Sequence, residues 1–301
     1  MYTTKTVSII IVAIFLLFSS LFSCSTDIDY NPSAIPRSLV IYSILKPDSS
    51  FNILVTKTQD IYDDEIGYIP DATVKIYNEN GVICDSALYT EKGVYVSKSK
   101  VIANEKLTVQ VEANGFESVR ATDYTPGKVE IKKAEYQYSY EYDPIDDYLY
   151  GLLTIVFDDD ANEKNYYELL LAEKQIDKGF VFYGRITPFM ISNEFVYADS
   201  KNQNKPQSIL FDDVICNGKE IVLKIKVYTQ TPPYIIMRNT TETYYRYQTS
   251  LYTYLFTQPV QNNDFFTVDP IGIYTNVNNG FGIVAGYNQS EYQSVNVGEN
   301  E

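Results

Sequence analysis

The sequence predicts a mainly β protein, with an N-terminal antiparallel β-sandwich and a larger β-rich second domain that carries one or two short helices. Short stretches in which apolar and polar residues alternate recur along the chain, for example at Ala72–Tyr77 and Lys106–Ala113. Turn signals such as Asn78–Gly81 separate them, and no long stretch of helical periodicity lies between them. Closely spaced strands without intervening helices are typical of antiparallel sandwiches.

Composition limits the possible functions. The chain has 301 residues, of which 45% are hydrophobic and 21% charged, so it can form a packed core. It has no histidine, which excludes Ser-His-Asp and Cys-His catalysis and metal sites built on imidazole. The net charge of −15 repels phosphate backbones, so we expect no nucleic-acid partner.

Strands of the first block are expected wherever alternation or β-branched content is highest. We place them at Ser38–Ile44, Phe51–Thr56, Ala72–Tyr77, Val82–Leu88, from Gly93 onwards and at Lys106–Ala113. The proline and glycine of Asp123–Lys128 then mark the approach to a linker.

The second block is also expected to consist mostly of strands. They are placed at Leu152–Phe157, Tyr166–Ala172, Phe180–Ile186 and Glu220–Tyr228. Tyr244–Gln258 is ambiguous, because its spacing of apolar residues fits a helix whereas its tyrosine and threonine content favours a strand. We predict a helix, because no turn residue interrupts it, with Leu251 near the centre of its apolar stripe.

These elements define the predicted domain boundaries: a signal peptide at 1–23, a lipidated tether at 24–37, a β-sandwich at 38–125, a linker at 126–135, a β-rich C-terminal domain at 136–297 and a tail at 298–301.

The N-terminus reads as an export signal. Lys5 precedes an apolar run from Val7 to Phe18 that is short for a membrane span, and Leu21–Cys24 follows. This end resembles a bacterial lipobox, which implies a lipid on Cys24 and anchoring in a bilayer. The alternative is a simple cleaved signal with an incidental cysteine. Two acids just after Cys24, Asp27 and Asp29, resemble the surface-export signal of Bacteroidota. We therefore favour an outer-membrane protein that faces the cell exterior over one that faces the periplasm.

The other two cysteines, Cys84 and Cys216, have apolar neighbours. An exported protein can form disulfides, but the two residues are 132 positions apart and are expected in different domains. We therefore favour two small buried thiols over a bridge.

Tyrosine is unusually abundant in this chain, which contains 29 tyrosines. Four of them follow one another at every second position, which would place them on one face of a strand: Tyr136, Tyr138, Tyr140 and Tyr142. Such a face is a candidate ligand-binding platform for sugars, peptides or aromatic ligands. The alternative is that the rings cover the core while their hydroxyl groups stay in water.

Acidic side chains give only weak candidates for other chemistry. Asp158, Asp160 and Asn162 have a spacing that calcium ligands use, but the sequence lacks the other positions of such a loop, so a solvated hairpin loop is favoured and no metal or other cofactor is expected. A hydrolytic pair is conceivable between the acids of 143–147 and Asp158 or Asp160. Gly280 and Gly282 do not lie between a strand and a helix, so they are interpreted as a turn with close packing.

Several motifs of the first block resemble a known module. Pro70–Ile76, Gly93–Tyr95 and Leu107–Phe116 are similar to the strands and turns of carboxypeptidase-regulatory, transthyretin-like domains, which are Ig-like sandwiches. The resemblance covers residues 38–125 and implies a module without catalysis of its own.

The whole chain resembles a lipoprotein family of Bacteroidota, domain of unknown function 4249. The features that carry the resemblance are Cys24, Ser38–Pro47, Asp71–Val74, Asn165–Tyr167, Tyr244–Tyr247 and Pro270–Val284. By association, it implies a non-catalytic binding or accessory component of a TonB-dependent nutrient uptake system, with an outer-membrane channel as the partner. A cell-envelope hydrolase with paired carboxylates and a purely structural envelope protein remain the alternatives.

Overall fold

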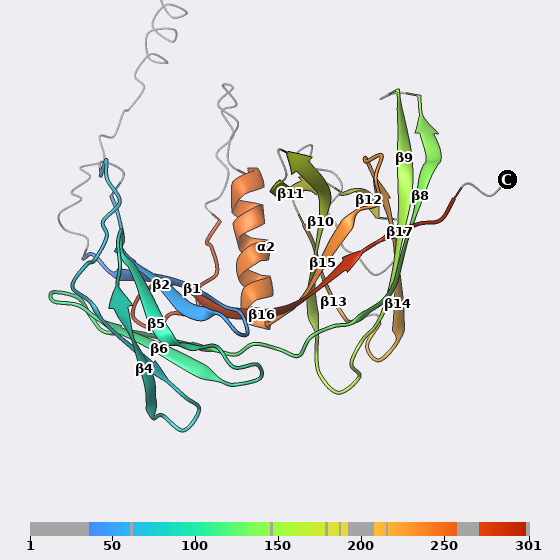
Figure 1. The fold of residues 1–301 in the computed structure, drawn as a ribbon. Helices are drawn as coiled ribbons and strands as arrows, with labels where there is room; N and C mark the ends of the chain where they lie inside the picture. Colours follow the sequence, from blue (N-terminus) through green and yellow to red (C-terminus); the bar gives the residue numbers. More distant parts are fainter. Residues whose placement is uncertain are drawn as a thin grey trace, which may run out of the picture. The chain divides into compact units, whose positions relative to one another are not determined.

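The computed structural model describes residues 36–60, 63–144, 147–177, 180–186, 188–191, 208–214, 216–257 and 271–298. The described residues from Arg37 onwards form one compact unit. This unit is mainly β, as the sequence predicts, with one helix in the described part (Figure 1). The signal segment, Cys24, Asp27 and Asp29 lie outside the described residues. Within the described ranges, no helix combines the length and the apolar character needed to cross a bilayer.

The first block of the chain is built from strands alone: β1 (Leu39–Leu45), β2 (Ser50–Lys57), β3 (Thr73–Tyr77), β4 (Ile83–Tyr89), β5 (Val94–Lys100), β6 (Leu107–Glu112) and β7 (Val119–Asp123). They follow the order β1-β2-β5-β4-β3-β6-β7, and each neighbouring pair is antiparallel. This agrees with the closely spaced strands expected from the sequence.

The core of the first block is one cluster of buried side chains that come from strands at both ends of this sheet. Leu39, Ile41 and Leu45 alternate along β1 and are fully buried. They belong to the same cluster as Val74 and Val109, which come from β3 and β6. The period of two in the sequence therefore sets which side chains point inward.

The second block contributes most of the remaining strands: β8 (Ile131–Asp143), β9 (Tyr148–Asp158), β10 (Tyr166–Asp177), β11 (Phe180–Ile186), β12 (Pro188–Ile191), β13 (Ile209–Asp212), β14 (Glu220–Val227), β15 (Tyr234–Thr240) and β17 (Val295–Asn296). A five-stranded sheet has the order β12-β14-β9-β8-β17. Strand β8 begins within the stretch expected to be a linker.

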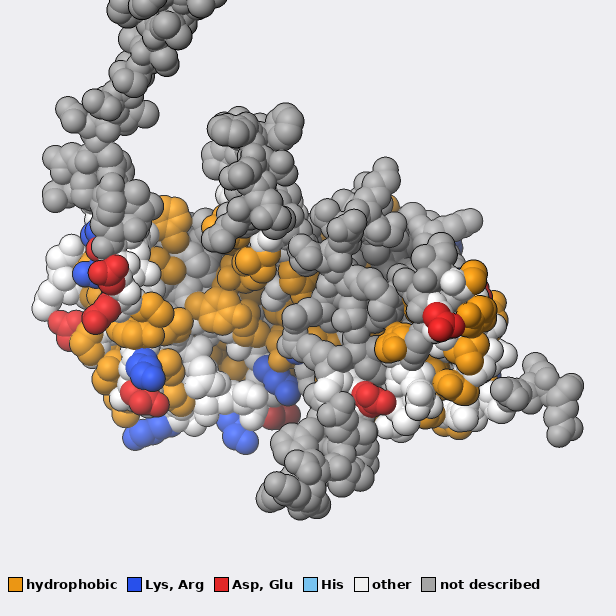
Figure 2. All heavy atoms as spheres, turned by 90° about the horizontal axis from the view of Figure 1, so that it is seen from above, with side chains coloured by type: hydrophobic (Ala, Val, Ile, Leu, Met, Phe, Trp, Pro, Cys, Tyr) orange, Lys and Arg blue, Asp and Glu red, His pale blue; other side chains and the backbone are white. Residues whose placement is uncertain are grey.

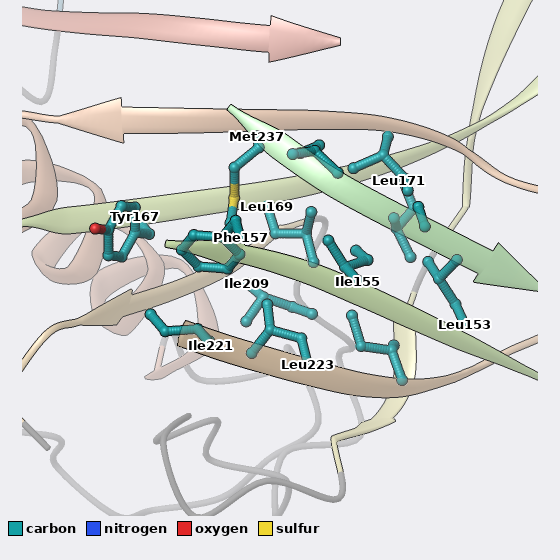
Figure 3. Close-up of a cluster of buried hydrophobic side chains, with 14 of the residues drawn as sticks. Leu153, Ile155, Phe157, Tyr167, Leu169, Leu171, Ile209, Ile221, Leu223 and Met237 are labelled. Atoms are coloured by element: carbon teal, nitrogen blue, oxygen red, sulfur yellow. The ribbon is translucent and has the colours of Figure 1, made fainter. Parts of the chain in front are cut away.

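The core of the second block lies between the five-stranded sheet and strands β10, β13 and β15 (Figure 3). Its aromatic centre is formed by Phe157 and Tyr167, whose ring centroids are 5.3 Å apart. Met237 of β15 and Leu223 of β14 pack into the same cluster. The alternation predicted for β14 is confirmed, because Ile221, Leu223, Ile225 and Val227 are buried at every second position and the residues between them are exposed or half-buried.

Strand β16 (Phe281–Gln293) joins the two blocks. Its first part pairs in parallel with β1, beginning at Val40 opposite Phe281, and its second part pairs antiparallel with β15. The result is a 12-stranded sheet that runs from β11 to β7 through both blocks. Just before β16, Asn278 forms an isolated antiparallel bridge with Arg120 of β7. The first block thus receives neighbours for both of its end strands from residues near the C-terminus.

Two glycines allow the backbone at the start of β16 to lie close to the backbone of β1. Gly282 has a φ of +104°, and a Cβ atom there would lie 1.9 Å from the Ile41 carbonyl oxygen. A Cβ atom at Gly280 would lie 2.6 Å from the Leu39 carbonyl oxygen. The interpretation of these glycines as positions of close packing is confirmed.

Helix α2 (Glu242–Thr257) confirms the helix predicted for this stretch and rises from the sheet beside β16 (Figure 1). Thr241 caps it, since its Oγ1 accepts a hydrogen bond of 3.2 Å from the Tyr244 amide. Tyr244 is 2% exposed, Leu251 is half-buried and Leu255 is 53% exposed. The apolar stripe predicted around Leu251 is therefore buried only in part, because its first residue, Tyr244, packs on the sheet and its last, Leu255, is exposed.

Candidate functional site

The four tyrosines of β8 do not form one exposed face, so this part of the prediction is wrong. Tyr136 is fully buried in the core of the second block, and its hydroxyl donates to the Thr229 carbonyl oxygen. Burial, followed by the neighbouring Tyr138, raises the pKa of Tyr136 to about 12. Tyr136 is therefore a core residue whose polar tip is satisfied by the backbone.

The other three tyrosines differ because β8 is irregular. The register with β9 shifts between Gln137 and Glu141, and Ser139 has a φ of 55°, so the alternation is interrupted there. Tyr138 packs partly against the core, whereas Tyr140 and Tyr142 are 46% and 54% exposed. The sequence carries no glycine or proline in this run that marks the irregularity.

The two candidate metal-ligating aspartates of the 158–162 loop have separate protein partners. Asp158 Oδ1 lies 2.6 Å from Lys132 Nζ. Asp160 Oδ1 accepts hydrogen bonds from the backbone N and the Nδ2 of Asn162, at 2.9 and 2.7 Å, and these bonds lower its pKa. Within the part of the chain that the structure describes, no group of three acidic or cysteine side chains is placed to hold a metal ion.

The acidic pair considered for hydrolysis is not formed by the described side chains. Asp147 precedes β9 and Asp158 ends it, and a strand of 11 residues separates its ends by about 33 Å. Asp147 Oδ1 instead accepts a hydrogen bond of 2.7 Å from the Tyr142 hydroxyl. Asp146 and the side chain of Asp143 lie outside the described residues.

Asp159 lies between Asp158 and Asp160 in the sequence and, unlike these two residues, is buried. It is 7% exposed and accepts hydrogen bonds from the Tyr167 hydroxyl and, at 2.7 Å, from the Gly218 amide. Burial raises the pKa of this carboxyl despite these hydrogen bonds. Phe157 points into the core, and Asp159 lies two residues later, so alternation along the strand points it the same way. This spacing was the signal in the sequence that Asp159 would be buried.

A buried polar cluster lies under helix α2, and sequence reasoning missed it. Its centre is Glu168 of β10, whose side chain is 2% exposed. Oε2 of Glu168 accepts hydrogen bonds from Arg238 Nη1 at 2.7 Å and from the Tyr244 hydroxyl at 2.8 Å. Oε1 accepts one of 2.8 Å from Ser208 Oγ. Both oxygens of this buried carboxylate are therefore engaged.

The register of the sheet brings the cluster together. Glu168 of β10 stands opposite Arg238 of β15, and Arg238 stands opposite Gln289 of β16. The Arg238 guanidinium also lies 4.3 Å from the centroid of the Tyr287 ring. Burial favours a lower pKa for Arg238, but the Glu168 carboxylate outweighs it, so the pKa is raised and the arginine stays charged.

This cluster holds the helix rather than presenting reactive groups. Burial and the Glu168 charge raise the pKa of the Tyr244 hydroxyl, which stays protonated and donates its hydrogen bond. One acid within the apolar run at 166–172 was the only sign in the sequence. Leu169 and Leu171 point into the core, so Glu168, next to Leu169, points to the opposite face of the sheet. The sequence alone does not show that a helix covers this face.

The described cysteines are both free, as expected. Cys216 is buried, but Cys84 is exposed, so the expectation of a buried thiol at position 84 is wrong. Ile76 pairs with Asp85 and Tyr77 with Ile83, which leaves Cys84 as the extra residue of a bulge.

An apolar surface lies on the side of the first block opposite its core. We call it the outer face; its residues are exposed or half-buried, and they are Val40, Tyr42, Leu54, Leu88, Val94 and Val96 of the first block and Phe281 of β16. The Tyr42 ring also lies 6.2 Å from the Tyr247 ring of α2. In register across the sheet, Tyr42 stands opposite Leu54, which stands opposite Val94. Leu88 and Phe281 are 59% and 52% exposed. The solvated face of an antiparallel sheet is usually polar, so this face departs from the expected pattern. Figure 2 shows hydrophobic side chains gathered on the side of the molecule from which α2 rises.

The fold and these clusters define a mainly β protein whose most deeply buried acids are bound by other groups of the chain. Residues 25–293 match the family described as domain of unknown function (DUF4249), and the chain belongs to this family. No curated protein matches the chain.

Proposed function

We propose that the protein is a lipid-anchored outer-membrane protein of Bacteroidota that faces the cell exterior. The observation that carries this proposal is the position of Cys24, where the apolar run of the N-terminal segment ends. A tether of about a dozen residues separates Cys24 from β1. At about 3.3–3.6 Å per residue, it keeps the folded unit within roughly 50 Å of the bilayer.

We further propose that the folded unit is a non-catalytic accessory component of a TonB-dependent uptake system. The outer face supports this role, because exposed contiguous apolar surface is characteristic of protein–protein contact sites. The buried acids Asp159 and Glu168 also support it, since their oxygens already accept hydrogen bonds within the protein. The proposed partner is an outer-membrane channel.

The test is co-purification of the intact protein from outer membranes in mild detergent, with identification of the bound proteins by mass spectrometry. We expect a TonB-dependent channel in near-stoichiometric amount. Leu88→Glu together with Phe281→Glu introduces charge on the outer face at exposed positions and should reduce the bound channel at least tenfold. Val214→Glu, at a site 68% exposed in the second block, is the matched control. Absence of any channel from the wild-type preparation would contradict the proposal.

A further inference from the structure

Asp123 lies where three parts of the fold meet. It ends β7 of the first block and is only 6% exposed. Its Oδ2 accepts a hydrogen bond of 2.6 Å from Thr241 Oγ1 and one of 3.0 Å from the Gly286 amide. One carboxylate oxygen therefore joins β7 to β16 and to the residue that caps helix α2.

The hydrogen bonds at this junction form a chain. Thr241 Oγ1 donates to Asp123 and accepts from the Tyr244 amide in the first turn of α2. The Thr241 amide donates to the Gly286 carbonyl oxygen at 3.0 Å. A Cβ atom on Gly286 would lie 1.7 Å from the Tyr124 carbonyl oxygen, so the backbones of β16 and of the residues after β7 are in close contact. A change at Asp123 therefore acts directly on the start of the helix.

Few charges offset the burial of this carboxyl. Lys106, just ahead of β6, is the basic group that acts on it, and Tyr124 is the neighbouring titratable group. Glu163 and Glu242 act on Tyr124, with Glu242 in the first turn of α2. Among the described residues, burial therefore outweighs the opposing effect of the Lys106 charge on Asp123.

We propose that Asp123 is a pH-sensitive link between the first block and helix α2, and that this link loosens as the pH rises through the weakly acidic range. The link is tightest when the carboxyl is protonated, because the buried site then holds no net charge. It is weaker when the carboxyl is ionised, because burial penalises the anion more than Thr241 and Gly286 compensate for it.

The direction of the pH effect follows from the linkage between protonation of Asp123 and folding. Burial raises the pKa of Asp123 from 3.8 to about 6 in the folded protein, against the hydrogen bonds from Thr241 and Gly286. A raised carboxyl pKa gives stability that is fully present below pH 3.8 and lost as the pH rises through 6. Over that range, the equilibrium constant for opening the junction should increase on the order of a hundredfold.

Amide hydrogen exchange measured by NMR on residues 25–301 tests the link. The informative amides are Gly286 and Tyr244, whose hydrogen bonds depend on the junction. After correction for the intrinsic pH dependence of exchange, protection at Gly286 and Tyr244 should fall between pH 4 and pH 7.5. In Asp123→Asn this fall should disappear, whereas the exposed Glu79→Gln should behave like wild type.

Two results would overturn the proposal: wild-type protection at these amides that does not change with pH after the intrinsic correction, or the same fall in Asp123→Asn. Should Asp123→Asn fail to fold, the carboxyl carbon of Asp123 can be titrated in the wild-type protein. A midpoint near 6 supports the link, and a midpoint at or below 4 contradicts it.

Discussion

Glu168 and Arg238 form a buried ion pair of 2.7 Å beneath helix α2. The two residues stand opposite each other on β10 and β15, and the Tyr244 hydroxyl from the helix donates to the same carboxylate oxygen. The pair therefore couples the register of two strands to the position of the helix. The effect of the pair on the free energy of unfolding depends on whether a variant removes one of the two charges or both.

Removing only the acid should destabilise the protein strongly. In Glu168→Gln, the Arg238 guanidinium keeps its charge in a largely buried site without a counter-ion. We expect a loss of about 3–5 kcal/mol in the free energy of unfolding, measured by urea denaturation. The exposed pair Lys128–Glu130 gives the control, because Glu130→Gln should cost less than about 1 kcal/mol.

Replacing both charges separates the penalty of an unpaired charge from the value of the pair. The double variant Glu168→Met, Arg238→Met should regain part of the stability lost in Glu168→Gln, because apolar side chains of similar size need no counter-ion. A double variant less stable than Glu168→Gln would contradict this explanation.

Helix α2 should contribute to stability mainly through its first half. Tyr244→Ala empties a buried aromatic site and should cost about 3–5 kcal/mol, whereas Leu255→Ala should cost less than about 0.5 kcal/mol. Leu251 is half-buried, so Leu251→Ala should fall between the two, near the lower end of the usual range for leucine. Thermal unfolding of the three variants gives the ranking, and equal losses at Tyr244 and Leu255 would show that the helix packs along its whole length.

Gly282 should not tolerate a side chain. In Gly282→Ala the methyl group meets the Ile41 backbone at a φ that other residues rarely adopt. We expect a loss of at least about 2 kcal/mol. Gly127→Ala is the control, because no atom lies within 4 Å of the added Cβ and its φ is not in the left-handed region. Similar melting temperatures for the two variants would contradict the role of Gly282 in the contact between β16 and β1.

Local pattern predicted the elements of this fold well, and it failed where distant segments meet. Alternation placed β14, and the spacing of apolar residues placed α2, because both signals depend on one element at a time. The parallel pairing of β1 with β16 joins residues about 240 positions apart and has no local signal. The irregularity at Ser139 was missed for a similar reason, since serine does not mark a left-handed backbone position.

The polar clusters were less predictable than the strands. The sequence identified the acids of the 158–162 loop. Their roles depend on which of them points inward in continuation of the alternation along β9. Glu168 looked like one acid in an apolar strand, and only the docking of α2 on that face explains its burial. Tyrosines at every second position predict a common face only if the strand is regular.

The first block should not fold without the C-terminal part of the chain. Residues 37–130 lack the strand that pairs with β1 and the segment that bridges β7. We expect this fragment to show poor chemical-shift dispersion by NMR, and a peptide of residues 274–293 added in trans to restore a folded spectrum. A fragment that unfolds cooperatively by itself, with the stability of the whole protein, would show that β16 is dispensable for the first block.

Anchoring through Cys24 is the central claim of the proposed function. Cys24→Ser removes the thiol that takes the lipid, so the variant should leave the membrane fraction or keep its signal segment. A variant that still sediments with membranes as a processed chain would argue against lipidation at this residue.

The most direct measurement is the intact mass of the protein purified from membranes of its native host, with fragmentation of its N-terminus. The account predicts a chain that starts at Cys24, lacks residues 1–23 and carries the mass of a diacylglyceryl group and an acyl chain on that residue. A mature chain with an unmodified Cys24, or one that starts elsewhere, would contradict it.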